Sequence, residues 1–163
     1  MKRLQDYFRT DPGSPPPVRV RVTGRRARFS EVDALGIVWH GRYASFFEEA
    51  HTELTRKCGI SWKQLRDAGL SAPIVQFHVD YFRTLRLDEE FETEAALFWN
   101  EGARINVQYT LRDSASGTIH ARGYTVQIFT ELESATPLWF SPELWEECRT
   151  RWKKGEFHHA ESK

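Results

Sequence analysis

The sequence contains few cysteines and no long apolar run. Its two cysteines, Cys58 and Cys148, lie far apart in a chain of 163 residues and match no metal-binding spacing. We therefore expect two core thiols and no disulfide framework. The chain has no stretch of about 18 apolar residues, the length needed to cross a membrane, and its N-terminus lacks the apolar segment of a secretory signal. These absences predict a cytoplasmic protein that does not insert into membranes.

An excess of charge of either sign is also absent. Lysine and arginine together number 23, as do aspartate and glutamate, so no net field favours nucleic acid or an acidic membrane surface. His158 and His159 are adjacent near the C-terminus, but without further ligands they do not indicate a metal site. We expect no nucleic-acid partner, no metal and no cofactor.

The length of the chain suits one domain, which would bury roughly 70% of its unfolded surface. Four prolines between Pro12 and Pro17 mark a linker, because proline fixes φ and removes an N–H donor. We expect an N-terminal extension and linker over residues 1–17, a core domain over residues 18–137, and a C-terminal helix and tail over residues 138–163.

The two ends of the chain contain amphipathic segments. The first eleven residues either form a short helix, which docks on the domain or on a partner through Leu4, Tyr7 and Phe8, or remain disordered. Residues 141–155 have acidic residues early, lysines late and a terminal glycine, which is typical of a helix. Its apolar side chains are expected to pack on the core.

Residues 43–58 predict the longest helix. Its apolar side chains have the spacing of one buried face, at Tyr43, Phe46, Phe47, Ala50, Leu54 and Cys58. Gly59 supplies the expected end of the helix. Such a helix is roughly 24 Å long at 1.5 Å per residue, enough to cross a small sheet. Residues 61–69 predict a second, short helix capped by Ser61.

The start of the long helix lacks a side chain that could cap it. His40 and Gly41 stand where Ser, Thr, Asp or Asn would be expected. The N–H groups at this positive helix end could therefore stabilise a carbonyl oxygen that gains negative charge. Asp33, just upstream, could supply a base or a nucleophile. Alternatively, Asp33 is a turn residue that hydrogen-bonds its own backbone ahead of Gly36.

Several segments have the composition and alternation of β-strands. They are residues 18–28, 72–83, 91–99, 105–111 and 119–131. The first is expected to bend at Gly24, and the second to be buried on much of both faces because apolar residues occupy both sets of alternate positions. Together with the long helix, the strands predict an α+β fold in which a curved antiparallel sheet wraps around that helix.

The residues around Asp33 also form a recognisable motif. The run Asp33-Ala-Leu-Gly36-Ile-Val-Trp39-His40-Gly-Arg-Tyr43, followed by Phe46, Phe47 and Glu48, resembles that of hot-dog fold acyl-CoA thioesterases of the 4-hydroxybenzoyl-CoA thioesterase type. The resemblance implies a hot-dog fold, to which the C-terminal helix is an addition. It also implies that Asp33 is the catalytic nucleophile or general base, and that the backbone N–H of His40 polarises the thioester carbonyl.

The same resemblance implies an active site between the subunits of a homodimer or a homotetramer. The backbone N–H of Gly41 is a second candidate donor to the carbonyl oxygen, and Trp39 and Tyr43 are candidates to line the substrate pocket. Arg104 is the nearest candidate to contact the phosphates of coenzyme A, since guanidinium groups suit phosphate. Other candidates for this contact are Arg83 and Arg122.

Some side chains near the motif have open roles. His40 could act through its imidazole ring as well as through its backbone. Glu48 either faces the acyl pocket or is an exposed helix residue, and Glu31 is expected to be a solvated loop residue. His78 and His120 are expected to be structural histidines.

The function that these observations predict is hydrolysis of an acyl-CoA thioester to a free acid and CoA. The acyl group remains open, because aromatic residues such as Trp39, Phe46 and Phe77 suit an aryl group or a fatty chain equally well. Two alternatives remain: a non-catalytic acyl-CoA-binding module on the same scaffold, and a thioesterase that acts on an acyl carrier protein.

Overall fold

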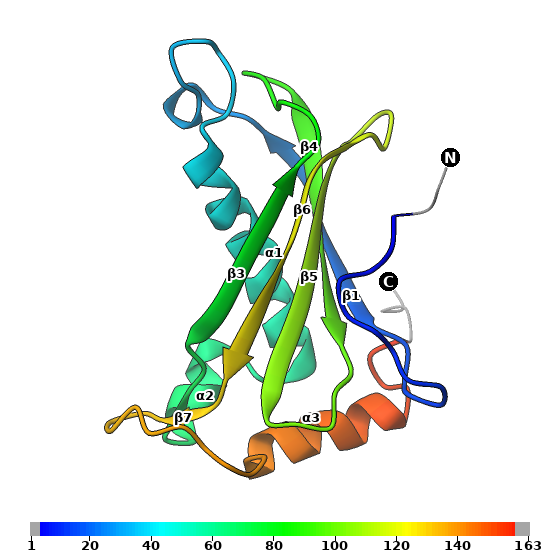
Figure 1. Ribbon diagram of the computed structural model, residues 1–163, viewed down its shortest axis with the longest axis vertical. Helices are drawn as coiled ribbons and strands as arrows, with labels where there is room; N and C mark the ends of the chain where they lie inside the picture. Colours follow the sequence, from blue (N-terminus) through cyan, green and yellow to red (C-terminus); the bar gives the residue numbers. More distant parts are fainter. Residues whose placement is uncertain (1–3, 159–163) are drawn as a thin grey trace.

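The computed structural model describes residues 4–158. Five antiparallel strands form one sheet in the order β1-β4-β5-β6-β3, and Figure 1 shows the long helix α1 behind it. Their bounds are Val18–Arg26 for β1, Glu90–Phe98 for β4, Arg104–Asp113 for β5, Ile119–Ile128 for β6 and Ile74–Tyr81 for β3. Two short strands, β2 (Leu70–Ser71) and β7 (Thr130–Glu131), pair separately. The predicted segment 119–131 is thus two strands.

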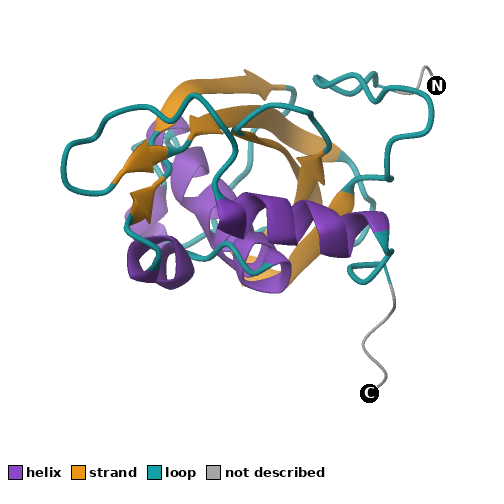
Figure 2. Cartoon of the chain, turned by 90° about the horizontal axis from the view of Figure 1, so that it is seen from below, coloured by secondary structure: helices purple, strands orange, loops and turns teal. Residues whose placement is uncertain are grey.

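The sheet curves over α1, which spans Tyr43–Cys58 (Figure 2). Phe47 stacks on Tyr109 of β5 with ring centroids 4.7 Å apart, and the other predicted apolar positions of α1 are also buried. Gly59 ends the helix with a left-handed φ of 75°, a conformation that glycine adopts without strain. The predicted hot-dog layout and the bounds of its central helix are confirmed.

Two short features that the sequence predicts, a bend in β1 and a cap on α2, are present in the structure. Strand β1 changes register between Val22 and Arg25, and Gly24 between them has a φ of 72°, so the predicted bend is confirmed. Helix α2 (Trp62–Asp67) is capped by Ser61, whose side chain accepts a hydrogen bond from the N–H of Gln64. Both features depend on residues next to one another in the sequence.

Strand β3 differs from the prediction because it lies at the edge of the sheet. The segment 72–83 was expected to be buried on much of both faces, but Ile74, Val75, Phe77 and Tyr81 each have half or more of their surface exposed. The prediction of burial is therefore wrong for the single chain. An exposed, apolar edge strand is unusual for a lone molecule, because its unpaired N–H and C=O groups can pair with another chain.

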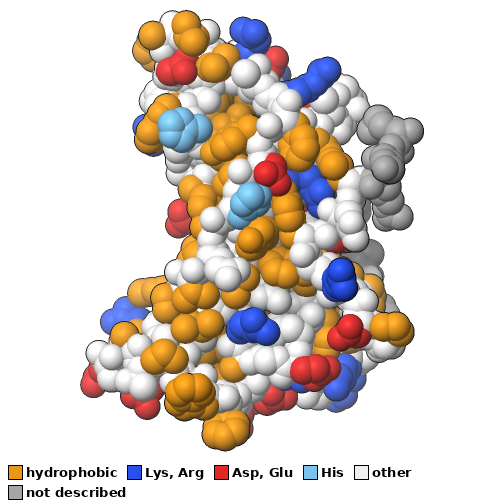
Figure 3. All heavy atoms as spheres, in the orientation of Figure 1, with side chains coloured by type: hydrophobic (Ala, Val, Ile, Leu, Met, Phe, Trp, Pro, Cys, Tyr) orange, Lys and Arg blue, Asp and Glu red, His pale blue; other side chains and the backbone are white. Residues whose placement is uncertain are grey.

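The N-terminal strap, residues 5–8, crosses the outer face of the sheet, on the side opposite α1. Tyr7 packs against Tyr124 with ring centroids 5.2 Å apart, and its hydroxyl bonds Asp80. Phe8 packs against Phe98. Figure 3 views this face and shows a band of apolar side chains down it. The predicted docking on the domain is confirmed, but the strap is extended and not helical.

Helix α3 (Glu143–Lys153) packs across one end of the sheet (Figure 1). Trp145 and Trp152 are almost fully buried and belong to the main core. Cys58 and Cys148 are both free and buried, as predicted, and a hydrogen bond with Cys148 together with burial raises the pKa of Cys58. Phe157, beyond the helix, is also part of this core.

Two further findings concern residues 4–158. None of their helices is both long and apolar enough to cross a bilayer. Their histidines, cysteines and acidic residues form no cluster of three or more that could hold a metal ion. His158 lies 3.4 Å from the carbonyl of Pro17 through Nε2, and His159 lies outside the described residues.

Candidate functional site

Asp33 opens a tight turn in the loop that leads to α1. Its N–H donates to the carbonyl of Ile37 over 2.8 Å, and its own carbonyl accepts from the N–H of Gly36 over 3.0 Å. The carboxylate Oδ1 accepts from the N–H of Leu35 over 2.8 Å, as expected of a turn aspartate. The backbone bonds hold the turn, and the bond from Leu35 orients the exposed carboxylate, whose Oδ2 accepts no hydrogen bond from the described residues.

Buried charges anchor the loop that carries Asp33. Glu31 is only 9% exposed, so the expectation of a solvated residue is wrong. Its carboxylate pairs with Arg25 of β1 over 2.9 Å and accepts from the N–H of Arg28 over 2.8 Å. Arg25 also pairs with Glu49 of α1 over 3.0 Å. The loop is therefore tied both to the sheet and to the helix, which holds Asp33 near the helix start.

One 3-10 turn, η2 (His40–Arg42), precedes α1 and has no side-chain cap. The N–H of Arg42 donates to the carbonyl of Trp39, but no acceptor among the described residues bonds the N–H of His40 or Gly41. A Cβ at Gly41 would overlap the ring of Trp39, so only glycine lets that ring lie this close. The predicted open helix start is confirmed.

A tyrosine from β3 holds the peptide between His40 and Gly41. The Tyr81 hydroxyl donates to the carbonyl of His40 over 3.0 Å, and the Tyr81 ring packs edge-on against Tyr43 with centroids 5.0 Å apart. Because a peptide group is planar, fixing the His40 carbonyl also fixes the direction of the Gly41 N–H. Burial raises the pKa of Tyr81, so its hydroxyl keeps its proton at neutral pH. Sequence patterns gave no sign of this contact.

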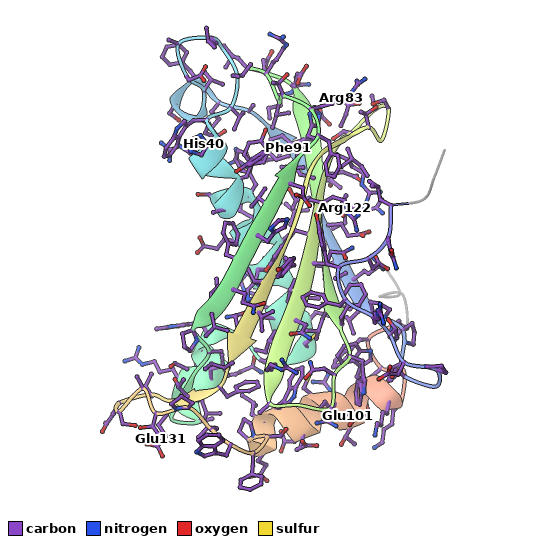
Figure 4. The ribbon with its side chains drawn as sticks, viewed as in Figure 1. His40, Arg83, Phe91, Glu101, Arg122 and Glu131 are labelled. Carbon is purple, nitrogen blue, oxygen red and sulfur yellow. The ribbon has the colours of Figure 1, made fainter. Side chains whose placement is uncertain are left out.

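A hollow of about 340 Å³ brings the main predicted residues together. Its lining includes Asp33, Trp39, His40 and Tyr43, with Tyr81 and Arg83 from the β3 side. Gly41 follows the lining residue His40 in the sequence but is not itself part of the lining. Figure 4 shows His40 and Arg83 at the same end of the molecule. A carboxylate, the backbone of His40 and a guanidinium thus line one hollow.

Two of the predicted arginines do not reach this hollow within one chain. Arg104 lies beside Gly102 in the turn that begins β5, and Figure 4 shows the neighbouring Glu101 at the end of the molecule opposite His40. Arg122 donates to the carbonyl of Gln5 over 3.0 Å and is taken up by the strap. Arg83 is therefore the predicted guanidinium that the fold brings to Asp33.

The remaining histidines and Glu48 have structural surroundings. His78 pairs with Asp80 over 3.0 Å and stacks on Tyr124 beneath the strap. His120 is buried, with Nδ1 3.1 Å from the carbonyl of Thr84. Glu48 is exposed on α1, although it borders a second hollow further along the helix.

Further along α1, the half-buried His51 joins a chain of hydrogen bonds. Its Nδ1 shares a hydrogen bond with the hydroxyl of Tyr109 over 2.8 Å, and that hydroxyl shares another with Thr125 over 2.9 Å. Burial lowers the pKa of His51 from 6.5 to about 4, and burial raises the pKa of Tyr109. His51 was not among the sequence candidates, because its surroundings come from β5 and β6.

The lowered pKa of His51 predicts a loss of stability in mild acid. Above pH 6.5 the residue is neutral both folded and unfolded. As the pH falls towards 4, the unfolded chain binds a proton that the folded chain does not, so the free energy of unfolding falls. A shift of this size corresponds to about 3 kcal/mol. Urea unfolding from pH 7 to pH 4 should therefore show a steeper loss in the wild type than in His51→Gln; parallel curves would contradict a buried neutral His51.

The fold and this hollow together define a protein of the hot-dog thioesterase class. The sequence profile of the Thioesterase-like superfamily matches residues 27–147, well over half of the chain. The chain belongs to that superfamily.

Individual relatives agree with this assignment. The chain is 28% identical to an acyl-CoA thioesterase, YbgC, of Haemophilus influenzae over 136 residues, which cover 82% of this chain and 91% of that protein. It is 38% identical to a candidate esterase of Aquifex aeolicus over 73 residues, 45% of this chain, and so spans 57% of that relative's length. A DHNA-CoA thioesterase of Staphylococcus aureus has a similar fold, with a TM-score of 0.70, 21% identity, and coverage of 87% of this chain and 94% of that one.

Proposed function

We propose that this protein hydrolyses acyl-CoA thioesters to a free acid and CoA. The observation that carries the proposal is the hollow that the Asp33 carboxylate shares with the open start of α1. The name of the Haemophilus influenzae relative, an acyl-CoA thioesterase, supports the same reaction. Arg83, at the edge of this hollow, is the proposed contact for a phosphate of CoA.

In this proposal the thioester carbonyl oxygen accepts hydrogen bonds from the N–H groups of His40 and Gly41. These groups lie at the positive end of the helix dipole, and one donor to a tetrahedral oxyanion is commonly worth about 3 kcal/mol. The developing negative charge is then stabilised by the backbone, so that the imidazole of His40 has no required role.

Asp33 has two possible roles in the same geometry. As a nucleophile it forms an anhydride with the acyl carbon, the C–S bond breaks, and the CoA thiolate leaves and takes a proton; water then cleaves the anhydride. As a general base it takes a proton from water as that water attacks the carbonyl carbon, after which the thiolate is expelled and protonated. Either route consumes one water and yields one acid and one thiol. A single turnover in heavy-oxygen water tests for the nucleophilic route, because only that route can label Asp33, when water cleaves the anhydride at the Asp33 carboxyl carbon.

The proposal is tested by release of free thiol from short, long and aromatic acyl-CoA substrates. Turnover of any of them supports hydrolysis and reports the substrate class. Binding without thiol release would contradict the proposal and favour a non-catalytic acyl-CoA-binding module. Turnover of acyl carrier protein thioesters alone would show that the substrate is a carrier-protein thioester, since the carrier and CoA share the phosphopantetheine arm.

Tyr81→Phe tests whether the hydrogen bond that orients the peptide group between His40 and Gly41 contributes to the reaction. Loss of the hydroxyl removes the hydrogen bond to the His40 carbonyl but keeps the ring that packs on Tyr43. Since one such bond is worth about 1 kcal/mol, kcat should fall roughly three- to tenfold. KM should change little, because the hydroxyl acts on the oxyanion donor and not on substrate binding. An unchanged kcat would show that Tyr81 does not position the Gly41 N–H.

We further propose that the protein is a homodimer formed through β3. This edge strand exposes Ile74, Val75 and Phe77, and pairing with a second copy would satisfy its free backbone groups. The opposite edge strand, β1, instead carries exposed arginines at positions 19 and 21, which discourage pairing. The strap covers part of the outer face, whereas the apolar side chains at the β3 edge stay exposed. Because Tyr81 and Arg83 are at this edge, the partner would border the proposed site.

A further inference from the structure

Residues 82–84 follow β3 without regular secondary structure and line the hollow of Asp33. Arg83, in the middle of this segment, is the guanidinium proposed to contact a phosphate of CoA. Its side chain is exposed, and an arginine side chain has many rotamers to lose when it binds. The position of the backbone of residues 82–84 therefore decides where the guanidinium can reach.

One residue of β6, His120, bonds all three residues of this segment. Its carbonyl accepts from the N–H of Phe82 over 2.8 Å and from the N–H of Arg83 over 3.1 Å. Its imidazole Nδ1 lies 3.1 Å from the carbonyl oxygen of Thr84. A carbonyl oxygen can only accept, so Nδ1 carries the proton and donates it. The first two bonds come from the backbone, but the third depends on the side chain at position 120.

The bond to Thr84 is the polar contact that the His120 ring contributes. The residue is only 5% exposed, and its other ring nitrogen, Nε2, is buried without a hydrogen-bond partner among the described residues. A hydrogen bond shielded from water is stronger than an exposed one. Nδ1 therefore holds the Thr84 carbonyl in one place.

The chain beyond Thr84 is held independently by the loop that carries Asp33. The carbonyl of Leu85 accepts from the N–H of Val38 over 2.8 Å, and the N–H of Leu87 donates to the carbonyl of Gly36 over 3.0 Å. Loss of the imidazole bond should therefore loosen residues 82–84 and leave the Asp33 turn in place.

We propose that His120 is a positioning residue for recognition of CoA: by holding the Thr84 carbonyl, it fixes the backbone of Arg83 so that the guanidinium meets a phosphate of CoA. The inference rests on the proposed function, in which Arg83 makes that contact. His120 itself is buried beneath the segment and touches neither the substrate nor the reacting atoms. Its effect is on affinity for the phosphate-bearing part of the ligand.

Two substitutions of nearly the same shape separate the hydrogen bond from packing. In His120→Asn the side-chain amide can donate from about the place of Nδ1, whereas His120→Leu has no donor. The probes are the thioethers S-octyl-CoA and S-octylpantetheine, of which only the first carries phosphates, and calorimetry gives both affinities. His120→Leu should weaken binding of S-octyl-CoA roughly three- to tenfold, as expected for one lost hydrogen bond.

The remaining affinities should change by less than a factor of about two. These are the affinity of His120→Leu for S-octylpantetheine and both affinities of His120→Asn. Equal weakening for the two probes would show a general structural role and overturn the inference, as would unchanged binding of S-octyl-CoA. If His120→Leu does not fold, His120→Gln replaces it, because its longer side chain brings the amide towards the place of Nε2 and away from Thr84.

A double-mutant cycle locates the effect at Arg83. Arg83→Gln should weaken binding of S-octyl-CoA roughly tenfold to a hundredfold, as expected for a bond between charged groups. Adding His120→Leu should then weaken it no further, because the positioned group is gone. His78→Leu, a control on the neighbouring strand whose histidine pairs with Asp80, should bind both probes as the wild type does. Additive losses in the double variant would contradict the inference.

The outcomes also separate this inference from the proposed function, because the probes report binding without turnover. If the wild type hydrolyses acyl-CoA but His120→Leu binds S-octyl-CoA normally, the thioesterase proposal stands and the role of His120 is wrong. If His120→Leu loses affinity for S-octyl-CoA alone but the wild type hydrolyses no acyl-CoA, the positioning role stands and the thioesterase proposal is wrong.

Discussion

Asp33→Asn should lower kcat for acyl-CoA hydrolysis by about a thousandfold, since a positioned base commonly contributes a factor of this order. An amide is a poor base and a poor nucleophile. The fold should be retained, because the asparagine Oδ1 can still accept the hydrogen bond from Leu35 that Asp33 accepts. Substrate affinity should change little, since the proposed N–H donors remain. Steady-state release of thiol gives kcat, and calorimetry with a thioether analogue gives affinity.

Asp113→Asn is the matched control for this variant. Asp113 also starts a turn, and its Oδ1 accepts from the N–H groups of Ala115 and Ser116 over 3.2 Å and 2.6 Å. It is partly exposed at the end of β5, where the hairpin to β6 begins, and does not line the hollow of Asp33. The two variants make the same chemical change in a turn, so only Asp33→Asn should lose activity. Activity near the wild-type level in Asp33→Asn would refute the proposed role of the carboxylate.

A double substitution on the exposed edge of β3, Val75→Lys with Phe77→Lys, should convert the proposed dimer to a monomer. Both side chains are 50% exposed in the single chain, and lysines on an edge strand oppose pairing. Like charges across an interface cost several kcal/mol, so the dimer dissociation constant should rise at least roughly a hundredfold. Analytical ultracentrifugation at micromolar concentration measures this change, and thiol release measures whether activity falls with it.

Thr23→Lys provides the comparison on the other edge of the sheet. Thr23 is exposed on β1, where the arginines of that strand already oppose pairing, so the variant should remain a dimer. A wild-type protein that sediments as a monomer would contradict the proposed interface. A monomeric double variant with full activity would show that the partner contributes nothing to the site.

The parts of the fold that depend on neighbouring residues were predictable from the sequence. The spacing of apolar residues in α1, the stop at Gly59 and the cap at Ser61 each express local geometry, and the structure has all of them. The same holds for the open start of α1, since the absence of a capping side chain at His40 and Gly41 is visible in the sequence.

The burial of β3 was not predictable in the same way. Apolar residues on both sides of a strand indicate that both faces are to be covered, but they do not tell whether the same chain or a second copy covers them. The pattern therefore predicts that Phe77 is buried, whereas it is half exposed in the single chain.

Other contacts escaped prediction because their partners are distant in the sequence. Tyr81 is 41 residues from His40, whose carbonyl it bonds, and the Tyr7 hydroxyl is 73 residues from Asp80. No local pattern distinguishes these tyrosines from core residues.

A crystal structure of the Asp33→Asn protein with an intact acyl-CoA tests the central claim most directly. The account predicts that the thioester carbonyl oxygen lies within hydrogen-bond distance of the N–H of His40 or Gly41, with the side chain at position 33 beside the carbonyl carbon. A thioester bound elsewhere, with those N–H groups facing solvent, would contradict it.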